Sequence, residues 1–347
     1  MIANKVLFAM AKYDRCKPEW GMSTFTIYPQ ALSESGLVGG VTAFYLDEMF
    51  SQSGSTGTSE MFLQWCASSP PDLIVFIPTG WANIDPSRMV MQTVIEKLGI
   101  KVAMIRGDAA GEYGHQFNQS WFPFVSFIVF IDITISSLGY SKKPKAIQGF
   151  ICANSKDFYD RKMARDLDVS FAGSVGNWLN RADHLEFLKE SGISVFTGGG
   201  LEYDTKVSVE DYSKIMNRSK VSLSFCLHRT EGFPMLKGRV FDIMCCETFL
   251  LEDKGTETVK FFEPNKDFVM YDTKEEMLEK IQYYLKHERA RQRVAESGHR
   301  KVAELYNPRN LWAYILERTG FDIPTEVAND GSYRLLSKKL EMVRWGI

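Results

Sequence analysis

The sequence predicts an α/β protein with two parallel β-sheets, each flanked by helices. Short runs rich in Val, Ile, Leu and Phe alternate along the chain with segments of helical periodicity. Such alternation is typical of parallel sheets, because the crossover between two parallel strands usually contains a helix. The chain has 347 residues, which suits two domains of about 150 residues each. Since the alternation restarts after a charged stretch in the middle of the chain, we expect two similar domains in succession.

The first half of the chain contains several apolar runs that we interpret as strands. They occupy residues 5–10, 41–50, 72–78, 101–108 and 124–135. Helices are expected between them, at 26–36 and 86–100. The longest apolar stretch, 121–139, is interrupted by Pro123 and Asp132 and falls short of the ~20 residues that a membrane helix needs. We therefore interpret it as a buried strand, with a peripheral membrane contact as the alternative.

A charged stretch at 136–167, poor in apolar runs, is expected to cross between the domains. The second half then repeats the alternating pattern. Its expected strands are 168–174, 193–200, 220–226, 248–253 and 268–272, and its expected helices are 180–192, 208–219, one that starts near Lys237, and 273–306 with a break near His287 and Glu288. Residues 308–347 are again helical in pattern. Two consecutive halves of this kind predict two Rossmann-like domains, with the cleft between them as the expected ligand site.

The bulk composition limits the classes of ligand. The formal net charge is −2, so no overall field would attract nucleic acid or anionic lipid, and an anionic ligand must be held by a local cluster of charge. The six cysteines form no CxxC pair, and Cys245 and Cys246 fall in an apolar run. This pattern indicates reduced thiols in a cytoplasmic protein rather than disulfides. No DxD motif is flanked by apolar strands, so no metal site is expected.

The segment DVSFAGSVGNWLNR (168–181) predicts a strand, a glycine-containing turn and a helix that opens near Asn180. Backbone N–H groups at such a helix start hold anions, and Gly173 lets the backbone approach a phosphate closely. Neither GxGxxG nor GxxxxGK[ST] occurs in a suitable place, so the fingerprints of nicotinamide-binding and P-loop proteins are missing. The alternative interpretation is an ordinary strand–turn–helix corner without a ligand.

A cluster of charge lies in KGRVFDIMCCETFLLED (237–253). A helix that starts near Lys237 places Arg239 and Asp242 on one face, at positions i and i+3. Surface ion pairs contribute only ~0–1 kcal/mol each, so a fold gains little from exposing this cluster. In a cleft, Lys237 and Arg239 would neutralise a diphosphate, and Asp242 would accept hydrogen bonds from sugar or ribose hydroxyls. Glu231, just upstream, would carry a second carboxylate to the same place.

Four segments of the second half, in this order, carry a family resemblance. They are DVSFAGS…NRADHLEFLKESGISVFTGGG, YSKIMNRSKVSLSF, LKGRVFDIMCCETFLLED and FFEPNKDFVMYDTKEEMLEKIQYYLKHERARQRVAESGHRKV. Together they resemble the carboxy-terminal domain of group 1 glycosyltransferases over about residues 165–315, and most closely the branch that includes the CgeB-like spore-maturation proteins. That family has the GT-B fold, in which two Rossmann-like domains face each other across a cleft and the second binds the nucleotide sugar.

The resemblance implies a division of the chain and a set of site residues. Residues 1–150 would form the acceptor domain, 151–315 the nucleotide-sugar-binding domain, and 316–347 helices that pack back on the first domain. The implied donor contacts are Gly173 and Ser174 in the phosphate loop, Arg181 at the phosphates, Lys237 and Arg239 as the basic pair, and Asp242 and Glu231 as the acidic positions. Two residues depart from the family pattern, since Asp242 replaces the usual glutamate and Glu247 replaces a small residue. Both substitutions are expected to change the donor contacts and therefore the identity of the bound sugar.

The first half supplies the expected proton acceptor. Asp108 stands at the end of the strand predicted at 101–108 and so lies at the carboxyl edge of the sheet, with His115 as the second candidate. A base is needed only if the enzyme inverts configuration, when the acceptor hydroxyl must lose a proton. A structural role is the alternative for His115. The basic amphipathic segment 333–347, which contains Trp345, is expected to pack on the first domain, with a membrane-surface or nucleic-acid contact as the alternative.

These observations predict a cytoplasmic glycosyltransferase that needs neither a cofactor nor a metal. It would move a sugar from a nucleoside diphosphate sugar, with UDP and GDP as the expected nucleotides, to a hydroxyl of a glycan, protein, lipid or modified DNA. Lys237 and Arg239 would act as catalytic groups that stabilise the leaving diphosphate in place of a cation. Two alternatives stay open, a non-catalytic nucleotide-sugar-binding protein and a nucleotide-sugar epimerase of the same architecture. Retention and inversion also both stay open.

Overall fold

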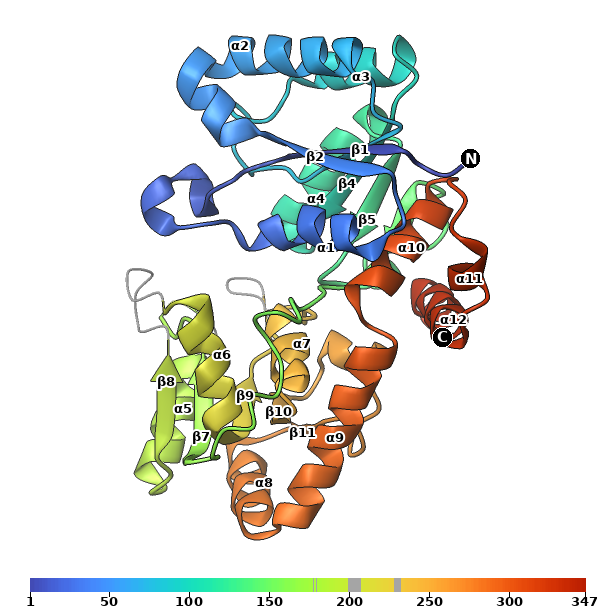
Figure 1. Cartoon of the computed structure of the whole chain (residues 1–347). Helices are drawn as coiled ribbons and strands as arrows, with labels where there is room; N and C mark the ends of the chain where they lie inside the picture. Colours follow the sequence, from blue (N-terminus) through green and yellow to red (C-terminus); the bar gives the residue numbers. More distant parts are fainter. Residues whose placement is uncertain (177, 179, 199–206, 228–231) are drawn as a thin grey trace. The chain divides into compact units, whose positions relative to one another are not determined.

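The computed structural model describes residues 1–176, 178, 180–198, 207–227 and 232–347 (Figure 1). The chain divides into two compact units. The first joins Met1–Phe150 to Pro308–Ile347, and the second is Ile151–Asn307. Each unit has its own parallel sheet, surrounded by helices. The predicted α/β class with two Rossmann-like domains is therefore confirmed.

The sheet of the first unit has the strand order β2-β1-β3-β4-β5-β6, and its strand pairs are parallel. Its strands are β1 (Lys5–Met10), β2 (Gly40–Tyr45), β3 (Leu73–Phe76), β4 (Lys101–Arg106), β5 (Phe127–Phe130) and β6 (Ala146–Gln148). Its helices are α1 (Ile27–Ser35), α2 (Leu46–Ser68), α3 (Arg88–Glu96), α4 (Gly111–Trp121), α10 (Pro308–Arg318), α11 (Thr325–Ala328) and α12 (Gly331–Trp345). Among the residues that the structure places, no helix is long and apolar enough to cross a membrane.

The carboxyl-terminal helices complete the core of the first unit. Figure 1 shows α2 and α3 along one face of the sheet and α1 beside α10 on the other. Trp312 of α10 is fully buried, and its ring lies 5.4 Å from Phe8 of β1 and 6.1 Å from Tyr28 of α1. Burying large aromatic rings is strongly favourable, so α10 is fixed to this sheet although it follows the second unit in sequence.

Helix α4 of the first unit was not predicted, and two further elements differ from the sequence prediction. The run 41–50 was expected to be one strand, but β2 ends at Tyr45 and α2 begins at Leu46. The Asp47 carboxylate accepts hydrogen bonds from the backbone N–H groups of Lys12 and Tyr13, each at 2.9 Å, which ties the start of α2 to the end of β1. The segment 136–167 was expected to be a crossing, but it contains β6, which pairs with β5. Both elements depend on partners distant in sequence.

The sheet of the second unit has the strand order β11-β10-β9-β7-β8, again with parallel pairs. Its strands are β7 (Leu167–Ala172), β8 (Val195–Gly198), β9 (Ser219–Ser224), β10 (Phe249–Asp253) and β11 (Val269–Tyr271). Its helices are α5 (Arg181–Glu190), α6 (Val209–Arg218), α7 (Gly238–Cys245), α8 (Lys274–Lys286) and α9 (Glu288–Glu304). The predicted break at His287 is confirmed, because α8 ends and α9 begins there.

Local sequence explains several of these boundaries. Ser208 and Thr273 cap α6 and α8, and each side chain accepts a hydrogen bond from the backbone N–H three residues on. Alternating strand residues such as Val169 and Phe171 of β7 and Leu223 of β9 enter one apolar core with helical side chains of this unit. Because the strands pair in parallel, their carboxyl ends lie at one edge of the sheet, where the predicted site residues gather.

Candidate functional site

The predicted helix after Lys237 is α7, and Lys237 is its N-cap residue. The helix has one buried apolar face, which consists of Val240, Phe241, Ile243 and Met244. Because this face packs inward, Arg239 and Asp242 lie on a different, half-buried side of α7. The N-terminus of the helix, with its free N–H groups and partial positive charge, therefore lies beside two cationic side chains.

Arg239 reaches from α7 to the carboxyl end of β7. Its Nε donates a hydrogen bond to the carbonyl oxygen of Ala172 at 2.5 Å, and its guanidinium lies 4.7 Å from the centre of the Phe171 ring. The buried Nη1 has no hydrogen-bond partner among the described residues. A buried donor without a partner is costly, so this nitrogen marks a place where a ligand oxygen would be well bound.

Gly173 makes room for that guanidinium. A Cβ at position 173 would lie 2.0 Å from Nη2 of Arg239, and the backbone φ of +154° is one that other residues rarely adopt. The expected glycine of the phosphate loop is thus required by the packing of Arg239 as well as by its own backbone conformation.

A second group of contacts brings Arg181 and Lys237 together around Trp178. The Arg181 guanidinium lies 3.9 Å from the centre of the Trp178 ring, and the Lys237 ammonium lies 4.9 Å from it. Arg181 is buried at the start of α5, and its Nη1 donates to the carbonyl oxygen of Ser174 at 2.7 Å. Cations are stabilised over an indole face, most of all where water is excluded. Trp178 therefore holds two cations from different helices near each other.

Three cations, Arg181, Lys237 and Arg239, thus converge where β7 ends and where α5 and α7 begin. Helix N-termini add backbone N–H groups with partial positive charge. The arrangement is suited to a ligand with several negative charges, such as a diphosphate.

Asp242 contributes a carboxyl group to the same side of α7. Burial raises its pKa from 3.8 to about 7, although the nearby Arg239 acts in the opposite direction, and Asp157 raises it further. Near neutral pH, Asp242 therefore populates both its carboxylate and its carboxylic acid forms. Hydrogen bonds from ligand hydroxyls would favour the carboxylate, which suits a residue that binds ribose or sugar.

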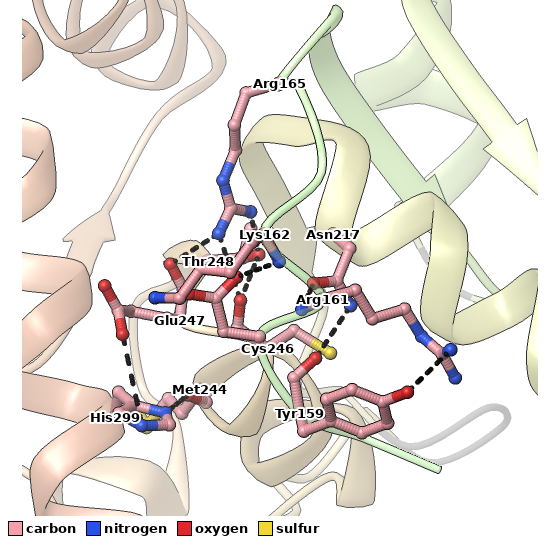
Figure 2. A network of polar contacts seen from close by, with 11 residues as sticks. Tyr159, Arg161, Lys162, Arg165, Asn217, Met244, Cys246, Glu247, Thr248 and His299 are labelled. Carbon is pink, nitrogen blue, oxygen red and sulfur yellow. Dashed lines mark hydrogen bonds and ion pairs between the residues drawn. The ribbon is translucent and has the colours of Figure 1, made fainter.

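Arg165 holds the other end of α7 in place (Figure 2). Its Nη2 donates to the carbonyl oxygens of Cys246 and Glu247 at 3.0 and 2.9 Å, and its Nη1 donates to those of Met216 and Ser219 at 3.2 and 3.1 Å. These oxygens belong to the carboxyl ends of α7 and α6 and to the first residue of β9. A cation at helix carboxyl ends satisfies carbonyl groups that would otherwise lack partners. Arg165 thus fixes the position of α7 relative to the sheet.

The first unit contains Asp108 and His115. Asp108 is exposed, has a φ of 48°, follows β4 at the carboxyl edge of the sheet as expected, and donates its backbone N–H to the carboxylate of Asp132. His115 is also exposed, on α4, with its Nδ1 2.8 Å from the hydroxyl oxygen of Tyr140. Asp85, which sequence reasoning missed, is buried near the same edge, and burial raises its pKa to about 6. Asp85 lies nine residues beyond the end of β3, so its position along the chain provided no clear signal.

The structure brings together most of the predicted donor-site residues. Gly173, Ser174, Arg181, Lys237, Arg239 and Asp242 all lie near the ends of β7, α5 and α7 in the second unit. Glu231 falls outside the described residues. Sequence reasoning did not single out Phe171 and Trp178, the rings that hold the cations. An aromatic residue between the glycine turn and Arg181 was the available signal for Trp178.

Residues 158–317 match a protein-family model described as glycosyl transferase-like. This segment is therefore similar to a glycosyl transferase-like domain. It contains every described residue of the cationic cluster, and it includes Arg165. A search of curated proteins found no sequence that matches the chain.

Solved structures extend the similarity to the whole chain. A glycosyltransferase from Rickettsia africae is similar with a TM-score of 0.61 and 8% identity, over 92% of this chain and 98% of that one. Sucrose-phosphate synthase from Thermosynechococcus elongatus has a TM-score of 0.59 and 9% identity, over 91% and 98% of the two chains. HepE from Anabaena, in complex with UDP-glucose, has a TM-score of 0.60 and 10% identity, over 90% and 98%. These similarities confirm the predicted GT-B fold, whereas the CgeB-like branch stays a prediction.

Proposed function

We propose that this protein is a glycosyltransferase that moves a sugar from a nucleoside diphosphate sugar to a hydroxyl acceptor. The observation that carries the proposal is the convergence of Arg181, Lys237 and Arg239 at two helix N-termini of a glycosyl transferase-like domain. Transfer of a sugar from such a donor leaves a diphosphate, whose negative charge grows in the transition state. Fixed cations and helix N–H groups stabilise that charge.

Each site residue has a role in this proposal. Lys237 and Arg239 stabilise the leaving diphosphate in place of a metal ion, and Arg181, which also contacts Trp178, binds its phosphates. Gly173 and Ser174 supply the loop along which the phosphates lie. Asp242, with Glu231, accepts hydrogen bonds from sugar or ribose hydroxyls. In an inverting reaction Asp108 would take the proton of the acceptor hydroxyl.

The proposal also includes the nucleotide of the sugar donor and the location of the protein in the cell. HepE from Anabaena is similar in fold and has been solved with UDP and with UDP-glucose, so UDP sugars are the first donors to test and GDP sugars the second. A cytoplasmic location is supported by the cysteines, because Cys16, Cys66, Cys152, Cys226, Cys245 and Cys246 are free thiols. The acceptor would be a glycan, a protein, a lipid or modified DNA.

The test measures release of nucleoside diphosphate from a panel of UDP, GDP, ADP and dTDP sugars. We expect slow release by the wild type and a loss of about 100-fold or more in Arg239→Ala, since one removed charge-stabilising donor costs that much in comparable sites. Lys286→Ala, which removes an exposed cation of α8 in the same unit, is the matched control and should keep full activity. Near-normal turnover by a folded Arg239→Ala protein would contradict the proposal.

Two outcomes of the same panel separate the alternatives. A thermal shift with a nucleotide sugar but no release of diphosphate, with or without acceptor hydroxyls, would indicate a binding protein. Appearance of an epimeric nucleotide sugar without any acceptor would indicate an epimerase. Either result would replace the proposed transfer reaction.

A further inference from the structure

Helix α12 of the first unit has two apolar rows on opposite sides. One row is buried and consists of Tyr333, Leu336, Leu340 and Val343. The other is exposed, with 55% of Leu335, 36% of Met342 and 51% of Trp345 accessible to solvent. Positions 335, 338, 342 and 345 recur every three or four residues, so Lys338 stands in the same exposed row. The buried row explains how α12 packs on its own unit, but the exposed row needs another explanation.

Basic residues lie in and near this exposed row. Arg334, Lys338, Lys339 and Arg344 lie on α12, and the segment SKKPK (141–145) lies beside its carboxyl end. Arg344 fastens that segment, because its Nη2 donates to the carbonyl oxygens of Ser141 and Lys143 at 3.2 and 3.1 Å. Ser141 in turn donates its hydroxyl to the Arg344 carbonyl oxygen at 2.8 Å. Lys142 and Lys143 are exposed there.

The charge of this region is opposite to that of the chain as a whole. Residues 141–145 and 331–347 together carry a formal net charge of +6, whereas the whole chain carries −2. The acid within the helix, Glu341, accepts a hydrogen bond from Tyr314 at 2.6 Å and pairs with Arg318 at 2.6 Å. The basic charge is therefore concentrated in these two neighbouring segments of a protein that is otherwise acidic.

We propose that this face docks on an anionic lipid surface. We call it the α12 face and define it by Leu335, Lys338, Met342, Trp345, Lys142 and Lys143. An exposed apolar row flanked by Lys and Arg is the arrangement with which helices lie in the interface of a membrane, where the apolar side chains enter the headgroup boundary. The indole of Trp345 suits that boundary, because it has an apolar body and a polar N–H.

The mixture of apolar and basic side chains on the α12 face favours an anionic lipid surface over a nucleic acid as its ligand. A nucleic acid would use the cations, but exposed Leu335 and Met342 would gain nothing from phosphate groups. An acidic lipid surface uses both kinds of side chain, since apolar insertion and attraction of Lys and Arg add. The buried row holds α12 against its own sheet, and Figure 1 shows α12 in dark red on the outside of the first unit. The helix is therefore already formed before it meets a membrane.

The test is sedimentation of the full chain with phosphatidylcholine vesicles that contain or lack phosphatidylglycerol. We expect binding to the anionic vesicles, weaker binding to the neutral ones, and a decrease with added salt. The double variant Leu335→Ser with Trp345→Ser should bind at least ten-fold more weakly. Lys142→Glu should weaken binding about five-fold or more, the factor expected for one basic residue near such a surface.

Two exposed positions of the first unit provide matched controls. Met89→Ser removes an apolar side chain of α3 that is 76% exposed, and Lys97→Glu makes the same charge reversal at the end of that helix. Both should bind vesicles as the wild type does. A blue shift of tryptophan emission on vesicle binding, present in the wild type and reduced in Trp345→Phe, would place this ring in the interface.

Several results would overturn the proposal. They include no sedimentation with anionic vesicles, equal loss in the two controls, and an unchanged emission shift in Trp345→Phe. A concentration-dependent dimer that the Leu335→Ser, Trp345→Ser variant abolishes would assign the face to a second copy of the chain. Binding to a nucleic acid that survives this double variant and is lost in Lys142→Glu would assign it to that ligand. Circular dichroism of each variant would verify that α12 remains folded.

Discussion

Glu252 of β10 allows a quantitative test of the energetics of the second unit. Its side chain is fully buried, and its Oε1 accepts a hydrogen bond from Ser224 Oγ at 2.9 Å. Burial raises the pKa of this carboxyl from 4.5 to about 7, and the adjacent Asp253 adds to the increase. Glu252→Gln keeps the size and the hydrogen-bond acceptor but does not titrate.

The direction of the pH effect follows from the raised pKa. Between about pH 4.5 and pH 7 the folded protein binds more protons at Glu252 than the unfolded chain does, so the free energy of unfolding falls as pH rises through this window. A pKa difference of about 2.5 corresponds to ~3 kcal/mol at full deprotonation. From about pH 5 to pH 8 we expect the wild type to lose ~2.5 kcal/mol through this one group, and Glu252→Gln to be spared that loss.

The assay is urea unfolding followed by circular dichroism at the two pH values, for the wild type and the variant. The two proteins should be about equally stable at the lower pH, and Glu252→Gln should be the more stable at the higher one. Glu279→Gln, on the exposed side of α8, makes the same chemical change in water and should keep the wild-type pH dependence. If the wild type and Glu252→Gln lose the same free energy of unfolding between these pH values, the reasoning is wrong.

Two further predictions concern the positioning of the cationic cluster. Gly173→Ala should displace Arg239 and weaken nucleotide-sugar binding by ten-fold or more in a thermal-shift titration. The strained backbone should also cost about 1–3 kcal/mol of stability. The control is Gly192→Ala, which is also at positive φ but has open space around it and should leave binding unchanged. Arg165→Ala should lower the free energy of unfolding by about 3 kcal/mol, because buried carbonyl oxygens lose their donor. In the same urea assay, Lys162→Ala, at an exposed position, should change the free energy of unfolding little.

Local signals in the sequence were sufficient for most elements. The start of α7 at Gly238, the break at His287 and the strands of the second unit follow from capping residues, apolar runs and periodicity. Helix α2 was missed because its Gly and Ser residues are weak helix formers, and its start depends on Asp47 binding the backbone of Lys12 and Tyr13. Strand β6 was missed because a short strand acquires its identity from the neighbour with which it pairs.

The sequence spacing predicted that candidate residues of α7 lie close together, but not how they contact the rest of the unit. Lys237, Arg239 and Asp242 lie within one turn or two of a helix, so their proximity could be read from spacing. The contact of Arg239 with Ala172 and Phe171 could not, because 67 residues separate Arg239 from Ala172 in the chain. Trp178 could have been noted from its position near Arg181, but its contact with Lys237 at the start of α7 could not be predicted from spacing.

By itself, the order of residues determined most of the alternation of strands and helices, the ends of several helices and the charges placed at the start of α7. These features depend on interactions between residues a few positions apart, which act whether or not the rest of the chain is folded. Only the tertiary structure decided that β7 and α7 meet at Gly173, that Trp178 holds Arg181 and Lys237 together, and that burial raises the pKa of Asp242. Desolvation and contacts between distant segments exist only once the sheet has assembled, and for that reason they had no local signature.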